Sequence, residues 1–165
     1  MEKIIQKNRA QFSKVNDPFV ILPFLLKQTS DTIINAIELE LAGHNVSIPQ
    51  ARILYFLARE NRPVTILEIS KWVFRELNSV TFIINKMEKE GLVSKFSQPG
   101  ERKAYISLTD KGADLFYNHI TENAQYLIFG VLTQAEREEF EANLIKLLRK
   151  AQNALGIDFK PSFLP

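Results

Sequence analysis

The chain contains no cysteine and only two histidines. The missing thiols exclude disulfide bonds, thiolate metal sites and cysteine nucleophiles. His44 and His119 stand 75 positions apart, and neither has neighbours at metal-ligand spacing. We therefore expect neither a metal site nor a cofactor, and both histidines to be ordinary residues of a helix surface or of the core.

Long apolar runs are also missing. The longest, 19–26 and 125–132, fall far short of the roughly 20 residues of a membrane-spanning helix, and charges occupy N-terminal positions where a signal peptide has its apolar core. We expect a cytoplasmic protein without membrane contact. The 165 residues, 45% of them hydrophobic, suffice to bury the core of one domain that spans residues 1–165.

Net charge is only +2, but the cations gather in the middle of the chain. Residues 52–111 hold 11 Lys or Arg against 7 Asp or Glu, and the remainder holds 10 against 12. A basic middle between slightly acidic arms is a weak indication of binding to a polyanion.

Capping residues predict where several helices begin. Asp17-Pro18 supplies an N-cap and a proline at the first helical position, and the apolar stripe after it ends near Gly43. Pro23 either kinks this helix or marks its true start, and residues 1–16 resemble a loosely held arm. Capping boxes predict helices over about 48–59, 66–73 and 134–155; the boxes are Ser47 with Gln50, Thr65 with Glu68 and Thr133 with Glu136.

Between Gly91 and Thr109 the apolar residues alternate with polar ones, which is typical of strands. Gln98-Pro-Gly-Glu101 separates the two alternating runs, and proline followed by glycine suits a type II turn. We expect a β-hairpin with an exposed tip.

The segment 75–93 is the most informative part of the chain. Val80, Ile83, Ile84 and Met87 recur at helical spacing and must face the core, which leaves polar side chains on the opposite face. A helix followed at once by a short basic hairpin is the outline of a winged helix-turn-helix. Such a helix offers short donors and acceptors to bases in the major groove of duplex DNA and a charge to phosphate; the candidates are Asn78, Ser79, Thr81, Asn85 and Lys86.

Asn85 is the best candidate for direct base contact, because an amide can pair bidentately with adenine. Phe82, on the same face, has two interpretations. Its ring could contact a thymine methyl group in the groove, or it could pack against the preceding short helix near Trp72.

Four cations bracket this helix. An arginine on a wing can reach into the adjacent minor groove, and lysines there can neutralise phosphates. The alternative is a solvated hairpin with ordinary surface charges. The four residues are Arg75, Lys95, Arg102 and Lys103.

Two long helices expected over 110–132 and 134–155 carry apolar residues at spacings of three and four. Together with the N-terminal helix, they exceed what a small winged helix needs to cover itself. We expect them to pack against a second copy of the chain, and an intramolecular helical layer is the alternative.

With these residues in place, the chain resembles the MarR (multiple-antibiotic-resistance) family of transcriptional regulators. The similarity lies in four motifs that occur in the family's order. They are Val46-Ser47-Ile-Pro-Gln50 at the entry to the second helix, Val80-Thr81 with Met87-Glu88-Lys-Glu-Gly91-Leu92-Val93 at the recognition helix and its exit, Gly100-Glu101-Arg102-Lys103 at the wing, and Leu108-Thr109-Asp-Lys-Gly112 at the following helix start.

The sequence departs from the family pattern at three places. Phe82 stands where the family often has a polar residue, and Glu101 and Lys103 replace the more usual Asp and Arg of the wing. Phe74-Arg75-Glu76 replaces the common turn with its glycine and capping Ser or Thr.

The resemblance implies a mainly α fold with a small β-hairpin wing. Residues 46–109 would form the winged helix-turn-helix, and residues 17–43 and 110–156 the helical dimerisation part. It implies a homodimeric regulator, usually a repressor, which binds a pseudo-palindromic operator in double-stranded DNA and is released by a small, often aromatic effector. The carried-over DNA contacts fall on Asn78, Ser79, Thr81, Asn85 and Arg102.

An effector pocket would have to come from aromatic residues that are equally suited to an ordinary core. These are Phe24, Tyr55, Phe56, Phe116 and Tyr117.

Two other classes of function compete with a regulator. A winged helix used as a protein-interaction module would explain an exposed Phe82 but leaves Asn85 and the basic wing without a role. An enzyme has the least support, because the sequence shows no Gly-rich phosphate loop, no His or Cys dyad and no carboxylate pair tied to a cleft.

Overall fold

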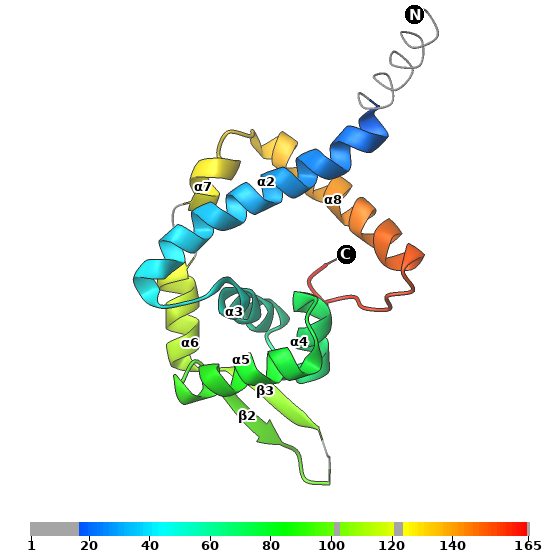
Figure 1. Ribbon diagram of the computed structural model, residues 1–165. Coiled ribbons are helices and arrows are strands. Elements are labelled where there is room, and N and C mark those ends of the chain that lie inside the picture. The colour runs from blue at the N-terminus through cyan, green and yellow to red at the C-terminus, as the bar shows by residue number, and fades with distance from the viewer. Residues whose placement is uncertain (1–16, 101–102, 121–123, 165) are drawn as a thin grey trace, which may run out of the picture.

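The computed structural model describes residues 17–100, 103–120 and 124–164, so the expected arm 1–16 lies outside the described residues. The fold is mainly helical with one small sheet, which confirms the expected fold class (Figure 1). The elements are α2 (Pro18–Leu41), η1 (Ala42–His44), α3 (Ile48–Glu60), β1 (Val64–Thr65), α4 (Ile66–Val73), α5 (Leu77–Lys89), β2 (Val93–Ser97), β3 (Ala104–Leu108), α6 (Asp110–Leu115), the π-helical turn η2 (Phe116–Ile120), α7 (Ala124–Phe129) and α8 (Gln134–Ala154).

The helices begin where the capping residues predict. Asp17 Oδ1 accepts a hydrogen bond from the N–H of Phe19 at 2.9 Å at the start of α2, and all three expected capping boxes are formed, at α3, α4 and α8. Pro23 lies inside α2 and therefore does not mark its start. These ends are set by local side-chain to backbone hydrogen bonds, which is why sequence alone locates them.

The sheet has three antiparallel strands in the order β1-β3-β2. The expected hairpin is confirmed: Val93 pairs with Leu108 and Ser97 with Ala104, and Gly100 has the positive φ of 84° that its place in the turn requires. Strand β1 was not expected, because two residues are too few to show a periodicity. It adds to the sheet through Val64, which pairs with Ile106.

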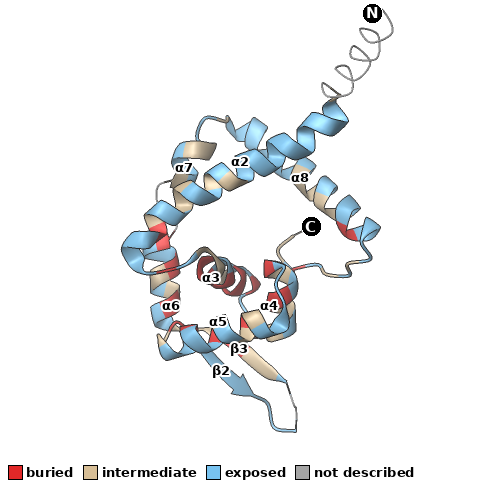
Figure 2. Cartoon of the chain, viewed as in Figure 1, coloured by how far each residue is buried: buried red, intermediate tan, exposed pale blue. Residues whose placement is uncertain are grey.

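The core lies between α3, α4, α5 and the sheet (Figure 2). Gly112 brings α6 against this core, because a Cβ at that position would collide with the carbonyl oxygen of Leu92 and press on Leu108. The glycine of the Leu108–Gly112 motif is thus required by a close backbone approach. Residues with no measurable exposure include Ile53, Leu54, Phe56, Val64, Ile69, Val80, Ile84, Met87 and Ile106.

The expectation of one long α-helix over 110–132 is wrong. Helix α6 gives way to the π-helical turn η2 at Phe116, and α7 ends at Phe129, before Gly130. The wider π turn keeps both Phe116 and Ile120 in the core, so their spacing of four residues fits either kind of helix. Apolar spacing therefore could not reveal the change of helix type.

Helices α2 and α8 cross beside the core rather than on it (Figure 1). The apolar seam of α2 is buried at its end, at Leu41, and exposed further back, at Leu22 and Leu26. Phe140 and Leu147 of α8 are likewise exposed. A closed intramolecular layer would have covered them. No helix of the described chain is long and apolar enough to cross a bilayer.

Candidate nucleic-acid interface

The turn before α5 is built around a left-handed residue. Helix α4 ends at Val73, and Phe74 follows with φ 54° and ψ 51°, a conformation that costs a non-glycine residue roughly 1–2 kcal/mol. The N–H of Arg75 then closes the turn by donating to the carbonyl of Ser70 at 3.2 Å. Phe74 thus takes the place that glycine often fills at a helix end, and it positions Arg75 at the entry to α5.

Arg52 supports this turn from α3, a role that sequence reasoning missed. Its guanidinium donates to the carbonyls of Trp72 at 3.2 Å and Val73 at 3.4 Å, so a cation meets the negative end of α4. Burial, and secondly the nearby Arg75, lower the pKa of Arg52. Two guanidinium groups therefore lie near the turn, and only the long-range fold could reveal the pairing.

Helix α5 presents the two faces that its sequence predicts. Val80, Ile84 and Met87 are fully buried, and Ile83 is half-buried against the core. The opposite face carries Asn78, Phe82, Asn85 and Lys86 as exposed residues, and Ser79 and Thr81 as half-buried ones.

Two of the expected reading residues have polar partners within the protein. Thr81 donates its hydroxyl hydrogen to the carbonyl of Leu77 at 2.8 Å, which leaves its oxygen as an acceptor and its methyl group as an apolar contact. Asn85 Oδ1 accepts from Lys95 Nζ at 3.2 Å. Lys95 lies on β2, so this bond joins the helix to the wing and leaves the two amide hydrogens of Asn85 unused by it.

A second set of contacts fixes the end of α5. Gln50, the partner of the N-cap Ser47 in the capping box of α3, is buried and donates through Nε2 to Glu90 Oε2 at 2.9 Å. Glu90 also lies 3.7 Å from Lys86 Nζ, and its carbonyl accepts from Lys111 at 2.7 Å. Lys86 can thus serve phosphate only by sharing its charge with Glu90.

The wing is stiffened by cross-strand pairs. Ser94 and Ser107 share a hydrogen bond of 2.7 Å, and the rings of Phe96 and Tyr105 stack with centroids 6.1 Å apart. Lys103 is exposed directly before the first residue of β3, on the side of the hairpin turn. Arg102, the expected minor-groove residue, lies outside the described residues.

Phe82 does not pack on the preceding helix. Its side chain is 74% exposed, and the ring partners that the structure gives Trp72 are Tyr55, Phe56 and Phe163. The interpretation in which Phe82 is tucked against Trp72 is wrong, because Trp72 turns inward to the core and α5 carries Phe82 outward.

The two histidines meet despite their distance in sequence. The rings of His44 and His119 have centroids 5.4 Å apart, and His119 Nε2 lies 3.8 Å from Asp114 Oδ2. Both are exposed. Among the described residues no group of three or more His, Cys, Asp or Glu side chains is placed to hold a metal ion.

Four of the five aromatic residues considered for a pocket lie together. Tyr55, Phe116 and Tyr117 form a chain of ring contacts, and Phe56 lies in the adjoining core against Trp72, Phe159 and Phe163. Phe24 is exposed on α2 and has no ring pair within the described residues. Phe159 and Phe163 were not anticipated as parts of this cluster, because nothing in the C-terminal sequence shows where it returns.

The helix pair, the αL turn and the wing are the parts of a winged helix, and residues 46–112 match the winged helix DNA-binding domain family. This segment has the fold of a winged helix and is similar to that family of DNA-binding domains. The match starts at the entry to α3 and ends at the close approach of Gly112, so it covers every candidate DNA-contacting residue of the chain.

The whole chain has the fold of MarR-family regulators, which confirms the fold that the resemblance in sequence implied. It is similar to a mutant MarR from E. coli complexed with operator DNA, at 19% identity and a TM-score of 0.67, over 80% of this chain and 96% of that one. It is similar to S. aureus MepR in a DNA complex, at 22% identity and a TM-score of 0.65, over 78% and 96%.

A third similar structure is NadR in complex with 4-hydroxyphenylacetate, at 24% identity and a TM-score of 0.66, over 76% of this chain and 91% of that one. No curated protein sequence matches the chain.

Proposed function

We propose that the protein is a sequence-specific, DNA-binding transcriptional regulator of the MarR type that acts as a homodimer. The observation that carries this proposal is the surface shared by α5 and the wing, where Asn85 and Lys95 are hydrogen-bonded beside the exposed Asn78 and Phe82. An amide that reads a base, next to an ammonium group that can neutralise phosphate, is what recognition in a major groove requires.

The DNA contacts and the dimer contacts would lie in different parts of the chain, divided at the boundaries of the winged helix. Residues 46–109 would hold the DNA contacts, namely Arg75, Asn78, Ser79, Thr81, Phe82, Asn85, Lys86, Lys95, Arg102 and Lys103. Residues 17–43 and 110–156 would hold the dimer contacts.

The exposed apolar surface supports the dimer. Phe19 is 88% exposed and Phe24 74% on α2, and Leu127 is 79% exposed on α7. An apolar groove of about 620 Å³ is lined by residues of α2, α7, α8 and the C-terminal segment, Leu26, Phe140 and Leu164 among them. Apolar surface of this extent marks an interface, and a second copy of the same helices would fill it with matching chemistry.

A two-fold axis through these helices would present two copies of α5 to successive major grooves about 34 Å apart. The operator would then be pseudo-palindromic, and binding within a promoter would repress transcription. The protein would act in the cytoplasm. A small aromatic effector is the proposed releasing ligand, in line with the 4-hydroxyphenylacetate bound by NadR.

Selection from a random duplex library tests the proposal. The protein should enrich an inverted repeat with half-sites about 10 base pairs apart, and light scattering should give the mass of a dimer. A Leu147→Asp variant should lose both properties together, because Leu147 is 59% exposed and lines the apolar groove, where the charge would stand. Glu138→Lys is the control for a change in surface charge alone, because Glu138 is exposed on the first turns of α8.

A protein-interaction module is the second candidate, and the 74% exposed ring of Phe82 favours it. The two functions differ in one measurement. At low salt the regulator comigrates with duplex DNA and yields a sequence motif, whereas an interaction module shows no comigration even at high protein concentration.

A further inference from the structure

The chain does not end with α8. Residues 157–164 leave the end of α8 and return to the winged helix, where they lie against α3 and α4 (Figure 1). We infer that this C-terminal strap, residues 158–164, positions the DNA-reading helix relative to the dimerisation helices and so determines which half-site spacing the protein accepts. The inference rests on the proposed function.

The strap is held first by aromatic contacts. Phe163 meets the ring of Trp72 edge-on at 5.3 Å and that of Tyr55 at 5.7 Å between centroids, and the guanidinium carbon of Arg59 lies 5.3 Å over its face. Phe159 adds a contact with Phe56 at 6.2 Å. Edge-on rings and a cation over a ring face are each favourable beyond the area that they bury.

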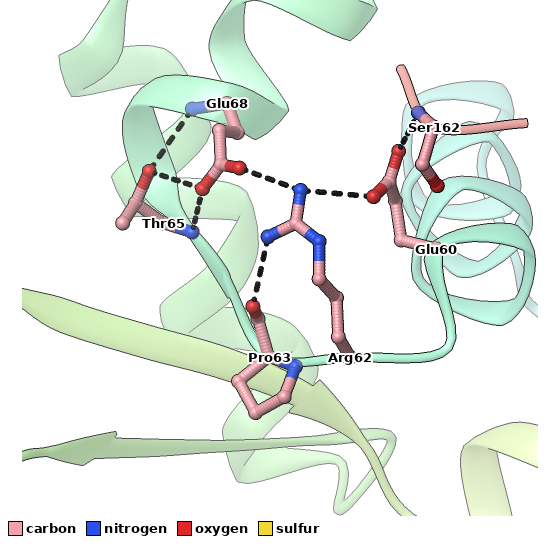
Figure 3. A network of polar contacts seen from close by, with 6 residues as sticks. All are labelled: Glu60, Arg62, Pro63, Thr65, Glu68 and Ser162. Carbon is pink, nitrogen blue, oxygen red and sulfur yellow. Dashed lines mark hydrogen bonds and ion pairs between the residues drawn. The ribbon is translucent and has the colours of Figure 1, made fainter. Parts of the chain in front are cut away.

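A polar anchor locks the strap to the end of α3 (Figure 3). The backbone N–H of Ser162 donates to Glu60 Oε1 at 2.8 Å. Glu60 Oε2 lies 2.9 Å from Arg62, and the Glu60 side chain is fully buried. A buried carboxylate needs such partners, so the strap supplies one of the two groups that make this burial tolerable.

The anchor extends to the start of α4. Arg62 also binds Glu68 at 2.8 Å, and Glu68 completes the capping box with Thr65. Ser162, Glu60, Arg62 and Glu68 thus form one network (Figure 3). Only the turn 74–76 separates α4 from α5. Contacts that hold α4 in place therefore also hold α5, the proposed DNA-reading helix.

The other end of the strap belongs to α8. Gln152, which is buried on α8, donates to the carbonyl of Phe159 at 3.2 Å and accepts from Arg149 at 3.1 Å. Lys71 of α4 donates to the carbonyl of Asp158 at 3.3 Å. The strap therefore connects α8, a helix of the proposed dimerisation part, to the winged helix that carries α5. Its release would allow the angle between α8 and the winged helix to change.

The test uses the full-length protein and the operator obtained by selection, together with operators that have one base pair inserted or removed between the half-sites. Phe163→Ala should bind the selected operator about fivefold or more weakly, the lower end of a typical coupling between sites. It should also discriminate less between the three spacings. Phe163→Tyr keeps the ring and should restore both properties.

Two controls separate positioning from stability. Ser162→Ala keeps the backbone N–H that binds Glu60 and should match the wild type. Trp72 is the only tryptophan of the chain, so its emission reports directly whether the strap is docked; it should shift to the red in Phe163→Ala. If that variant unfolds, Phe163→Leu removes the aromatic contacts with a smaller loss of volume.

The outcomes are distinct. A variant that is folded and dimeric, with the strap undocked and with wild-type affinity and spacing preference, overturns the inference and leaves the proposed function intact. The same holds if Phe163→Ala leaves the Trp72 emission unchanged, because the strap would not be docked as described. If the wild type selects no operator, the proposed function fails first and the inference fails with it.

Discussion

Lys95 Nζ on the wing lies 3.2 Å from Asn85 Oδ1 on the reading helix. The bond orients the amide, because an amide oxygen that accepts from an ammonium group turns its NH₂ group the other way. It also brings a phosphate-seeking charge beside a base-reading group. The two residues are ten positions apart in sequence, and only the sharp exit at Gly91 brings them together.

Asn85→Ala should relax the sequence preference at one position of each half-site, with a loss of about 1–3 kcal/mol against the preferred base. Lys95→Ala should weaken binding to all sequences and reduce the salt slope by about one, and it should relax the preference at the Asn85 position only in part, because the amide stays but loses the bond that orients it. Titrations at several salt concentrations on preferred and substituted operators measure both effects. An unchanged motif for Asn85→Ala would remove it from the reading residues.

Phe82→Ala tests the contact with a thymine methyl group. The ring is 74% exposed, so its removal should change the free energy of unfolding by less than about 0.5 kcal/mol. Wild type should bind an operator with uracil in place of the contacted thymine about fourfold more weakly, the value of one buried methyl group. Phe82→Ala should not distinguish the two operators. A variant that still distinguishes them would assign the methyl contact to another residue.

Local signals made much of this fold predictable. The capping boxes at Ser47, Thr65 and Thr133 involve residues three apart, and the structure forms all of them. The same holds for the two faces of α5, since burial there follows helical spacing.

Features that depend on distant contacts were not predictable. Gln50 has an obvious local task as a capping residue, yet it also binds Glu90, 40 positions away. Arg52 reaches the end of α4, and Phe163 joins the core of the winged helix. Each of these residues looks ordinary in the sequence, because its partner is chosen by the tertiary fold.

Gln50→Glu should preserve the capping box but place a second carboxylate against Glu90 Oε2, at the position of a 2.9 Å hydrogen bond. The free energy of unfolding should fall by about 1–3 kcal/mol at neutral pH. The repulsion raises a carboxyl pKa of the pair in the folded state, so the folded state gains protons more readily and the loss should shrink as the pH falls toward 5.

The matched control for this change is Gln134→Glu. Gln134 also donates to a glutamate, Glu138 at 2.9 Å, but on an exposed helix turn. Its replacement should cost only a few tenths of a kcal/mol. Urea unfolding at pH 7 and pH 5 compares the variants, and equal losses for both would show that burial of Gln50 does not matter.

Glu68→Gln should lower the free energy of unfolding at neutral pH and make it depend less on pH in the acid range. Burial alone would raise the pKa of Glu68, but hydrogen bonds from Thr65 and Arg62 outweigh it, and the pKa lies below the usual value. A depressed pKa means stability that is present above the unfolded value of about 4.3 and lost as the pH falls through the folded one. Because Glu68 is partly exposed, the difference between wild type and variant should be under about 1 kcal/mol at pH 7, and it should shrink as the pH falls through the lowered pKa of the folded state. Urea unfolding followed by Trp72 fluorescence from pH 7 to pH 3 measures it. A difference that stays constant across this range would mean that the ionised carboxylate contributes nothing, and that Gln fails in the capping box for a steric reason.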